Sequence, residues 1–213
     1  MNMIRNRLSE LLSERGLRIS RVSKEVGIAR SSLTSMVQND SEMLRYDAID
    51  KLCKFLNITP NDFFEYSPIA IEYTFDEDPD INYSIQNEFD NKLVLEKFNF
   101  DLLVDAEISE KIESFDLQVQ FMGFEANSKT NFKIKDEQNA KELKDIVGQL
   151  SPGLKNVLHK RLQKNLQTYI TSFLINDIEV NSVFSMADSD MNRLKKAFEK
   201  APVNLISNIF TEY

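Results

Sequence analysis

Residues 17–39 read LRISRVSKEVGIARSSLTSMVQN, and this stretch decides how the first third of the chain is interpreted. It predicts a short helix, a turn at Gly27-Ile28 and a second short helix. Apolar residues should face inward, namely Val22, Val26, Ile28, Leu33 and either Met36 or Val37. Polar residues should face outward, namely Arg30, Ser31, Thr34, Ser35 and Gln38. This arrangement favours a helix-turn-helix, in which the second helix enters the major groove of DNA.

The sequence around this motif carries a family resemblance. The matching segments are VGIARSSLTSMV at 26–37, YDAIDKLCKFL at 46–56 and LNITPNDFFEY at 56–66. From about residue 4 to residue 66 the chain resembles the lambda-repressor (Cro/CI, or XRE) helix-turn-helix domain, especially the short-turn variants of Gram-positive bacteria and their mobile elements. The resemblance implies an all-α domain of five helices, at about 3–15, 19–26, 30–38, 46–56 and 60–66.

Composition limits the class of protein. The 213 residues are 42% hydrophobic and 28% charged, as in soluble globular proteins. No apolar run approaches the 18 or so residues of a membrane span, and the amphipathic N-terminal segment does not look like a signal peptide. One cysteine, Cys53, excludes an intrachain disulfide and fits the apolar side of the helix at 46–56. We expect a cytoplasmic protein without a membrane partner, a metal or a cofactor.

Charge is unevenly distributed along the chain. Residues 1–38 contain seven basic and three acidic residues, whereas residues 67–213 contain 16 basic and 25 acidic residues. A net charge of +4 in residues 1–38 and of −9 in residues 67–213 suggests a basic DNA-binding part attached to an acidic module. Such a protein should bind DNA through one end, with strong salt dependence.

The second part of the chain predicts an α+β domain. We expect the domain boundary at Ser67-Pro68, giving domains 1–67 and 68–213. Apolar residues then alternate along 69–75, 81–85, 98–108 and 115–121, which predicts an antiparallel β-meander ending at Gly123. Helices should follow from Asp136 to about 150, from 152 to at least 174 and at about 189–200, and they should cover the sheet. Half of the apolar stripe on 154–174 is expected to pair with a second copy.

The start of the second helix of the motif is the predicted base-reading site. Arg30 can donate two hydrogen bonds to guanine O6 and N7, although a phosphate contact or an ion pair with Glu25 is the simpler alternative. Alignment on the Gly27-Ile28 turn implies base contacts for the neighbouring short side chains, with Ala29 suited to a thymine methyl group. The predicted base-reading set is Ala29, Arg30, Ser31, Thr34 and Ser35. Because Arg30 is the one strong base-reading side chain of this set, DNA shape should also contribute to specificity.

Phosphate contacts are expected from six polar residues, namely Arg18, Ser20, Arg21, Lys24, Gln38 and Arg45. Relatives usually hold a polar residue at the start of the first helix of the motif, where this chain has Ile19, so Ser20 or Arg18 should substitute. Arg45 precedes the helix at 46–56, where relatives place a basic residue against the DNA backbone. Each of these side chains is equally compatible with an ordinary solvated surface.

No enzymatic constellation is visible. The only histidine, His159, lies on a long helix where a surface or packing role is the simpler reading, and zinc, redox, nucleotide and dinucleotide motifs are absent. Many repressors of the resembling family carry a self-cleaving domain with an Ala-Gly or Cys-Gly bond, and neither dipeptide occurs here. Derepression should therefore use an antirepressor protein, a ligand or loss of the dimer.

These features predict a transcriptional regulator that is not an enzyme. We expect a prophage- or mobile-element-type repressor that binds a palindromic operator in double-stranded DNA as a homodimer, without self-cleavage, because one short recognition helix covers few base pairs. The alternative is an autoregulated antitoxin or anti-CRISPR-like inhibitor whose acidic C-terminal domain binds a protein partner.

Overall fold

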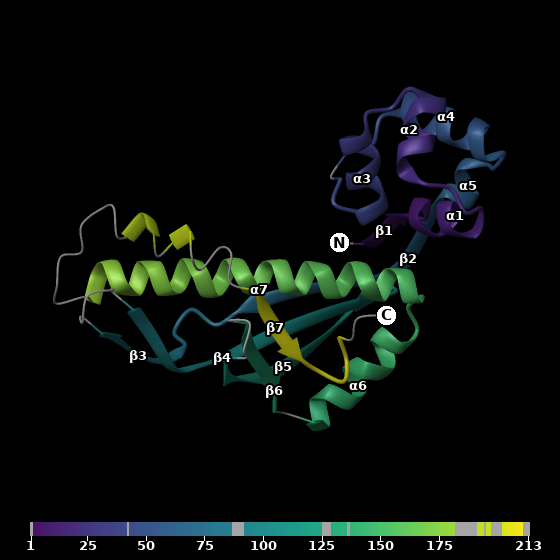
Figure 1. Cartoon of the computed structure of the whole chain (residues 1–213). Helices are drawn as coiled ribbons and strands as arrows, with labels where there is room; N and C mark the ends of the chain where they lie inside the picture. Colours follow the sequence, from purple (N-terminus) through teal and green to yellow (C-terminus); the bar gives the residue numbers. More distant parts are fainter. Residues whose placement is uncertain are drawn as a thin grey trace. The chain divides into compact units, whose positions relative to one another are not determined.

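The computed structural model describes residues 2–41, 43–86, 92–124, 129–135, 137–181, 191–193, 195–196 and 202–210 (Figure 1). The chain divides into two compact units, Met1–Ala70 and Ile71–Tyr213. The first unit is mainly helical, and the second is a sheet with helices, which gives a helical domain followed by an α+β domain.

Unit 1 contains helices α1 (Leu8–Glu14), α2 (Ile19–Val26), α3 (Arg30–Gln38), α4 (Tyr46–Leu56) and α5 (Pro60–Phe63). The bounds of α2, α3 and α4 are those that the sequence predicts. Apolar residues from all five helices share one core, in which Leu8, Val22, Leu33, Leu52 and Phe63 have no exposed surface. A core of this kind can hold short helices that would be marginal alone, because most of their stability comes from tertiary packing.

The helix predicted at 3–15 is wrong in its first half. Residues Asn2–Asn6 form strand β1, which pairs antiparallel with residues 64–70 of β2 (Phe64–Phe75). Met3 and Arg5 are buried, whereas Ile4 between them is 61% exposed. This alternation has the period of a strand. The backbone hydrogen bonds of β1 come from a segment about 60 residues away. A local sequence pattern does not show such a distant partner.

The same pairing shortens the last helix of the unit. The sequence predicts a helix over 60–66, but α5 ends at Phe63 and Phe64 begins β2. Arg5 ties the two strands to α1, since its Nε lies 2.6 Å from the Glu65 carboxylate and its Nη1 lies 2.6 Å from that of Glu10. Phe64 pairs with Asn6, so the ladder starts directly after the α5 turn.

Unit 2 is built on a mainly antiparallel sheet. Its strands are the remainder of β2, β3 (Asp80–Gln86), β4 (Lys92–Ile108), β5 (Lys111–Phe124), β6 (Thr130–Ile134) and β7 (Val203–Ile206), in the order β2-β4-β5-β6-β7 with β3 also paired to β4. Ser109 and Glu110 join β4 to β5 with φ values of 50° and 68°. Positive φ at both positions is what a two-residue hairpin turn of the favoured twist requires.

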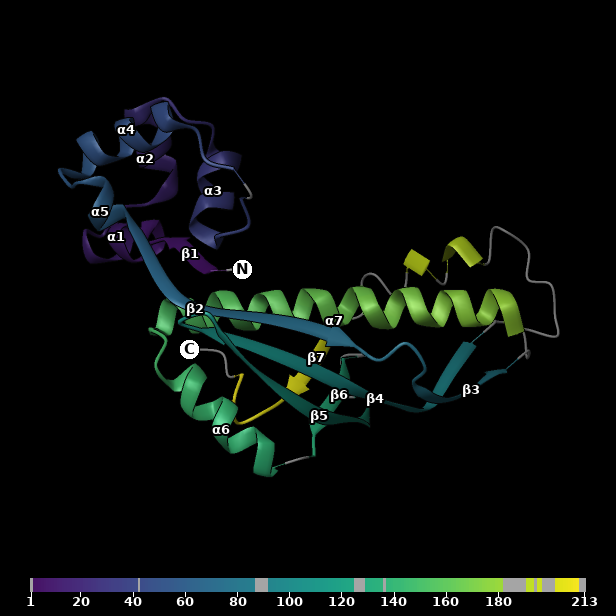
Figure 2. The same ribbon diagram turned by 180° about the vertical axis from the view of Figure 1, so that it is seen from behind.

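Helix α7 (Pro152–Asn181) covers this sheet (Figures 1 and 2). Every fourth residue of α7 is buried, namely Leu154, Leu158, Leu162, Leu166, Ile170, Leu174 and Ile178. The ring of Tyr169 stacks on Phe75 of β2 at 4.8 Å between centroids and meets Phe98 of β4 edge-on at 5.9 Å. The helix predicted from 152 is therefore present and longer than the predicted stripe. Its apolar stripe is used inside its own unit.

Two further predictions for this unit need correction. Gly123 does not end the β part, because β5 continues to Phe124 and strands β6 and β7 follow. Strand β7 pairs parallel with β6, which no simple meander contains. The four-residue segment carries too little sequence pattern to be recognised without its partner. Helix α6 (Glu137–Gly148) follows β6. Its predicted cap, Asp136, and most of the helix predicted at 189–200 lie outside the described residues.

Candidate nucleic-acid interface

The turn between α2 and α3 is fixed by local chemistry. Gly27 ends α2 with φ 68° in the left-handed region, which side-chain-bearing residues adopt at a cost. The Gly27 N–H donates to the Ser23 carbonyl at 3.1 Å, and the Ser23 hydroxyl donates to the Ile28 carbonyl at 2.7 Å. These two bonds determine how α3 leaves the turn.

Helix α3 packs through one face only. Leu33 and Met36 are buried, and the flanking Ile28 and Val37 pack partly against the same core. Val22, on α2, is also completely buried, and Val26 is partly buried. The inward side predicted from the sequence is therefore the side that faces the core, and the opposite side of α3 is presented to solvent.

The far end of α3 is held by an asparagine pair that the sequence reasoning missed. Asn39 ends the helix with φ 55°, and its Oδ1 accepts the Asn6 backbone N–H at 2.8 Å and the Asn6 side-chain amide at 2.9 Å. The Asn39 amide donates to the Asn6 carbonyl at 3.1 Å, and the Asn6 amide donates to the Met36 carbonyl at 2.8 Å. An asparagine directly after the last helical residue was the available signal, since it is a favoured left-handed C-cap.

The five residues predicted to read bases lie together at the first turns of α3. Ala29, Arg30 and Ser31 are exposed, whereas Thr34 and Ser35 are half-buried. The Thr34 hydroxyl donates to the Arg30 carbonyl at 2.9 Å, a common arrangement within helices. Because its only proton is used there, the Thr34 hydroxyl is available to a ligand as an acceptor.

The six residues predicted to contact phosphates are all exposed. They are Arg18, Ser20, Arg21 and Lys24 on or beside α2, Gln38 at the end of α3, and Arg45 before α4. The Arg45 side chain is 84% exposed and pairs with Asp47, with Nε 2.9 Å from Oδ1. The hydrogen bond from Arg45 lowers the pKa of the Asp47 carboxyl, which therefore stays charged beside it. Arg45 is therefore already paired with a carboxylate of its own domain.

Four helices of the unit, α1 to α4, begin without a side-chain cap at the N-cap residue. The residues at the N-caps of α2, α3 and α4 are Arg18, Ala29 and Arg45, and none of them makes a capping hydrogen bond from its side chain. Ser, Thr, Asn and Asp are preferred there, and a cation is unfavourable near the positive end of the helix dipole. These helix ends are therefore left with unoccupied N–H groups and, at two of them, positive charge, which is what a phosphate prefers.

The start of helix α5 differs from these. Thr59 and Asp62 form a capping box, in which the Asp62 carboxylate accepts the Thr59 N–H at 2.9 Å and the Thr59 hydroxyl at 2.6 Å. These bonds lower the pKa of the Asp62 carboxyl. The capped start of α5 therefore differs from the exposed, uncapped starts of α2, α3 and α4.

The structure also revises the charge count of the N-terminal part. Arg5 was counted with the basic residues of 1–38, but it is 8% exposed and paired with Glu10 and Glu65. It therefore supplies structure and is unsuited to contacting DNA. The exposed cations on or directly before α2 and α3 are Arg18, Arg21, Lys24 and Arg30.

Residues considered for other chemistry are structural. Cys53 is a free, buried thiol in the core of unit 1, and burial raises its pKa. His159 is buried on α7, where its Nδ1 lies 3.2 Å from the Phe210 carbonyl oxygen. Within the described ranges, no group of three or more His, Cys, Asp or Glu side chains is placed to bind a metal ion. The described helices include none with the length and apolarity needed to cross a membrane.

Comparison with known proteins matches this part of the chain. Residues 7–68 fit the family model of the Cro/C1-type HTH DNA-binding domain. The resemblance expected from the sequence is therefore confirmed for this segment. Neither the curated proteins nor the solved structures gave a match to the chain.

Proposed function

We propose, from the membership of residues 7–68 in the Cro/C1-type helix-turn-helix family, that this protein is a repressor that recognises a palindromic operator as a dimer. The family supports the coarser statement that the chain is a DNA-binding transcription regulator. The observation that carries the finer proposal is the outward cluster on α3, where Arg30 and its short neighbours stand exposed on a helix whose other face is buried.

Base readout is assigned to the first turns of α3. Arg30 donates to the major-groove edge of a guanine, for which its exposed guanidinium has the right geometry. Ala29 contacts a thymine methyl group, and Ser31 and Ser35 make weaker polar contacts. Thr34 acts only as an acceptor or through its methyl group, because its hydroxyl proton is bound to the Arg30 carbonyl. One strong reader among weak ones leaves part of the specificity to DNA shape.

Backbone contacts are assigned to the uncapped ends of α2, α3 and α4. Phosphates placed there accept the free N–H groups and meet Arg18 and Arg45, with Ser20, Arg21, Lys24 and Gln38 beside them. The cost of a cation at a helix N-terminus is then offset only in the complex with DNA. This explains why these positions lack the side chains that favour the free domain.

Unit 2 is assigned the remaining parts of the repressor function, dimerisation and reception of the inducing signal. No Ala-Gly or Cys-Gly bond exists in the chain, so self-cleavage of the known repressor type is not part of the proposal. Release from the operator is attributed to an antirepressor protein, a small ligand or separation of the dimer. Residues 67–213 carry nine more acidic than basic residues, which favours a basic partner protein among these.

The first experiment is footprinting and mobility-shift titration on DNA upstream of the protein's own gene. Arg30→Ala should cost about 1–3 kcal/mol at one base pair and relax specificity there. Arg15→Ala, which removes an exposed arginine at the end of α1, is the matched control and should leave recognition unchanged. Equal affinity of the wild-type protein and Arg30→Ala for operator and scrambled DNA would refute the assignment.

The acidic second domain supports one other function, inhibition of a partner protein by an autoregulated inhibitor. The observation in its favour is the charge difference between residues 1–38 and residues 67–213. An acidic surface can imitate DNA or block a basic cleft. Pull-down with residues 71–213 separates the two functions, because a dimerisation domain retains only further copies of itself.

A further inference from the structure

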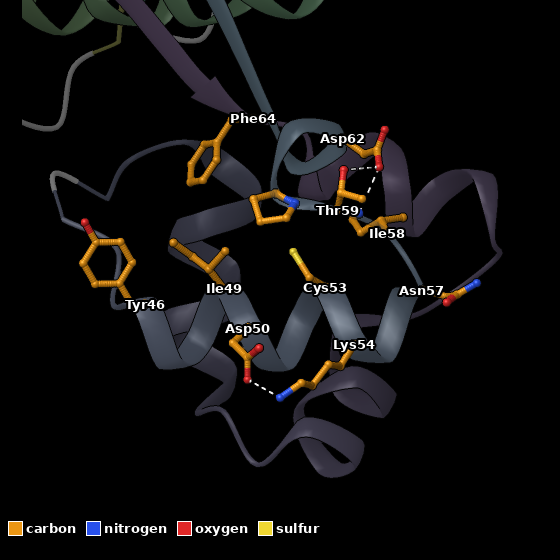
Figure 3. A pocket seen from close by; sticks show the side chains of 11 residues that line it. Tyr46, Ile49, Asp50, Cys53, Lys54, Asn57, Ile58, Thr59, Asp62 and Phe64 are labelled. Atoms are coloured by element: carbon orange, nitrogen blue, oxygen red, sulfur yellow. Dashed lines mark hydrogen bonds and ion pairs between the residues drawn. The ribbon is translucent and has the colours of Figure 1, made fainter.

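A groove of about 820 Å³ lies in unit 1 beside α4. Its walls are apolar on both sides, with Ile49 and Cys53 on α4 and Ile58, Pro60 and Phe64 opposite. Figure 3 shows Ile49 and Cys53 pointing from α4 into this space. All the lining residues come from 46–64, so the groove belongs to a single unit.

One end of the groove carries an aromatic ring with little contact of its own. Tyr46, the first residue of α4, is 90% exposed, and Figure 3 shows its ring at the end of the groove opposite Asn57. Met43, three residues earlier, is also 90% exposed. A large ring left as open as that of Tyr46 at the end of a concave apolar surface is typical of an interaction site. The same surface thus presents both a projecting side chain and a recess of apolar walls.

The charges on the rim favour a particular partner. Asp50 and Lys54 lie one turn apart on α4, with side chains 59% and 76% exposed and with Lys54 Nζ 2.7 Å from Asp50 Oδ2. Consider two α4 helices in antiparallel contact about a two-fold axis that passes midway between Asp50 and Lys54. Asp50 of each copy then faces Lys54 of the other copy. The same axis brings Tyr46 to the C-terminal end of α4 of the second copy, where Asn57 and Ile58 line its groove.

We propose that the α4 groove is an interface between two copies of this chain, in which each Tyr46 enters the groove of the other. A two-fold contact must be complementary to itself, and both the ring-and-groove pair and the Asp50–Lys54 pair satisfy that condition. A tyrosine ring offers a large contact area at small entropic cost. The inference rests on the proposed function for its purpose, which is to hold two recognition helices on one operator, and it adds a contact in unit 1 to the dimerisation assigned to unit 2.

The test exchanges charges between two variants of the full chain in the absence of DNA. In a dimer of the Asp50→Lys chain, or of the Lys54→Asp chain, like charges face each other at two places. The dimer dissociation constant of each variant, measured by sedimentation velocity, should therefore be about tenfold higher than that of the wild type or more. An equimolar mixture should recover wild-type association, because Lys at 50 in one chain then faces Asp at 54 in the other. Neither chain of the mixture has the Asp50–Lys54 pair within its own helix, so helix stability does not explain the recovery.

Tyr46→Ala should weaken association to a similar extent, and Tyr66→Ala is the control, since Tyr66 is 59% exposed and does not line the groove. Circular dichroism checks that each variant is folded. A wild-type chain that is monomeric, or single variants that associate as the wild type does, overturns the interface. So does a mixture that recovers nothing. Operator binding that still depends on Arg30 would then leave the proposed function standing.

Discussion

Replacement of Arg18 by serine should stabilise the first domain and weaken its hold on DNA. Arg18 occupies the N-cap of α2 with φ −92° and ψ 141°, a backbone geometry that suits a capping residue, but its side chain makes no capping hydrogen bond. The serine hydroxyl can accept an N–H of the first turn, which is worth about 1 kcal/mol. Removing a cation from the positive end of the helix adds about 0.3–1 kcal/mol, reduced here because the side chain is exposed.

A gain of about 1 kcal/mol should raise the unfolding temperature of a domain of this size by about 4–8 °C. Calorimetry of the full chain is the measurement, with the transition of the first domain followed separately, because a chain of two units does not unfold as one. In parallel, the operator affinity should fall, and the slope of log K against log salt should decrease by about 0.9 for the one lost phosphate contact.

Arg15→Ser is the matched control, because Arg15 ends α1 and its Nη1 donates to the Leu11 carbonyl at 3.1 Å. A cation at a helix C-terminus is favourable, so this change should slightly lower stability and leave DNA binding as it is. If Arg18→Ser stabilises the domain without any change in the salt slope, Arg18 has no phosphate contact. If it destabilises the domain, the interpretation of the uncapped helix ends is wrong.

Three other tests, at Asn39, Thr34 and Tyr83, address separate parts of the structure. Asn39→Ala should lower the free energy of unfolding, measured with urea, by about 1–3 kcal/mol, because it leaves buried groups of Asn6 unpaired. Asn39→Gly loses the same hydrogen bonds but should lower the free energy of unfolding less, because glycine adopts φ 55° with less backbone strain. Thr34→Val should reduce operator affinity less than Arg30→Ala, and an equal loss would show that the Thr34 hydroxyl contacts DNA. Burial and the hydrogen bond to Asp177 raise the pKa of Tyr83 to about 12. The folded state therefore keeps this proton longer than the unfolded chain does, so stability should fall as pH rises from about 10 through 12. Ultraviolet titration that finds Tyr83 ionising near pH 10 in the folded protein would contradict this.

The sequence by itself determined the parts of this protein that depend on short-range chemistry. The bounds of α2, α3 and α4 follow from apolar spacing and from Gly27, and the face of α3 that carries Arg30 follows from the same spacing. The alternation along β4 and β5 likewise predicted their buried faces. In each case the residues that fix the local structure lie within a few positions of one another.

Only the tertiary structure decided the parts that join distant segments. Residues 3–6 read as the start of a helix, yet they pair with β2, and Arg5, which was counted in the positive charge of residues 1–38, binds Glu10 and Glu65. Strand β7 exists through its pairing with β6, some 70 residues earlier in the chain. The Asn6–Asn39 pair and the groove beside α4 arise in the same way. A backbone segment forms a strand when another strand meets its hydrogen-bonding groups, and no local pattern records where that partner lies.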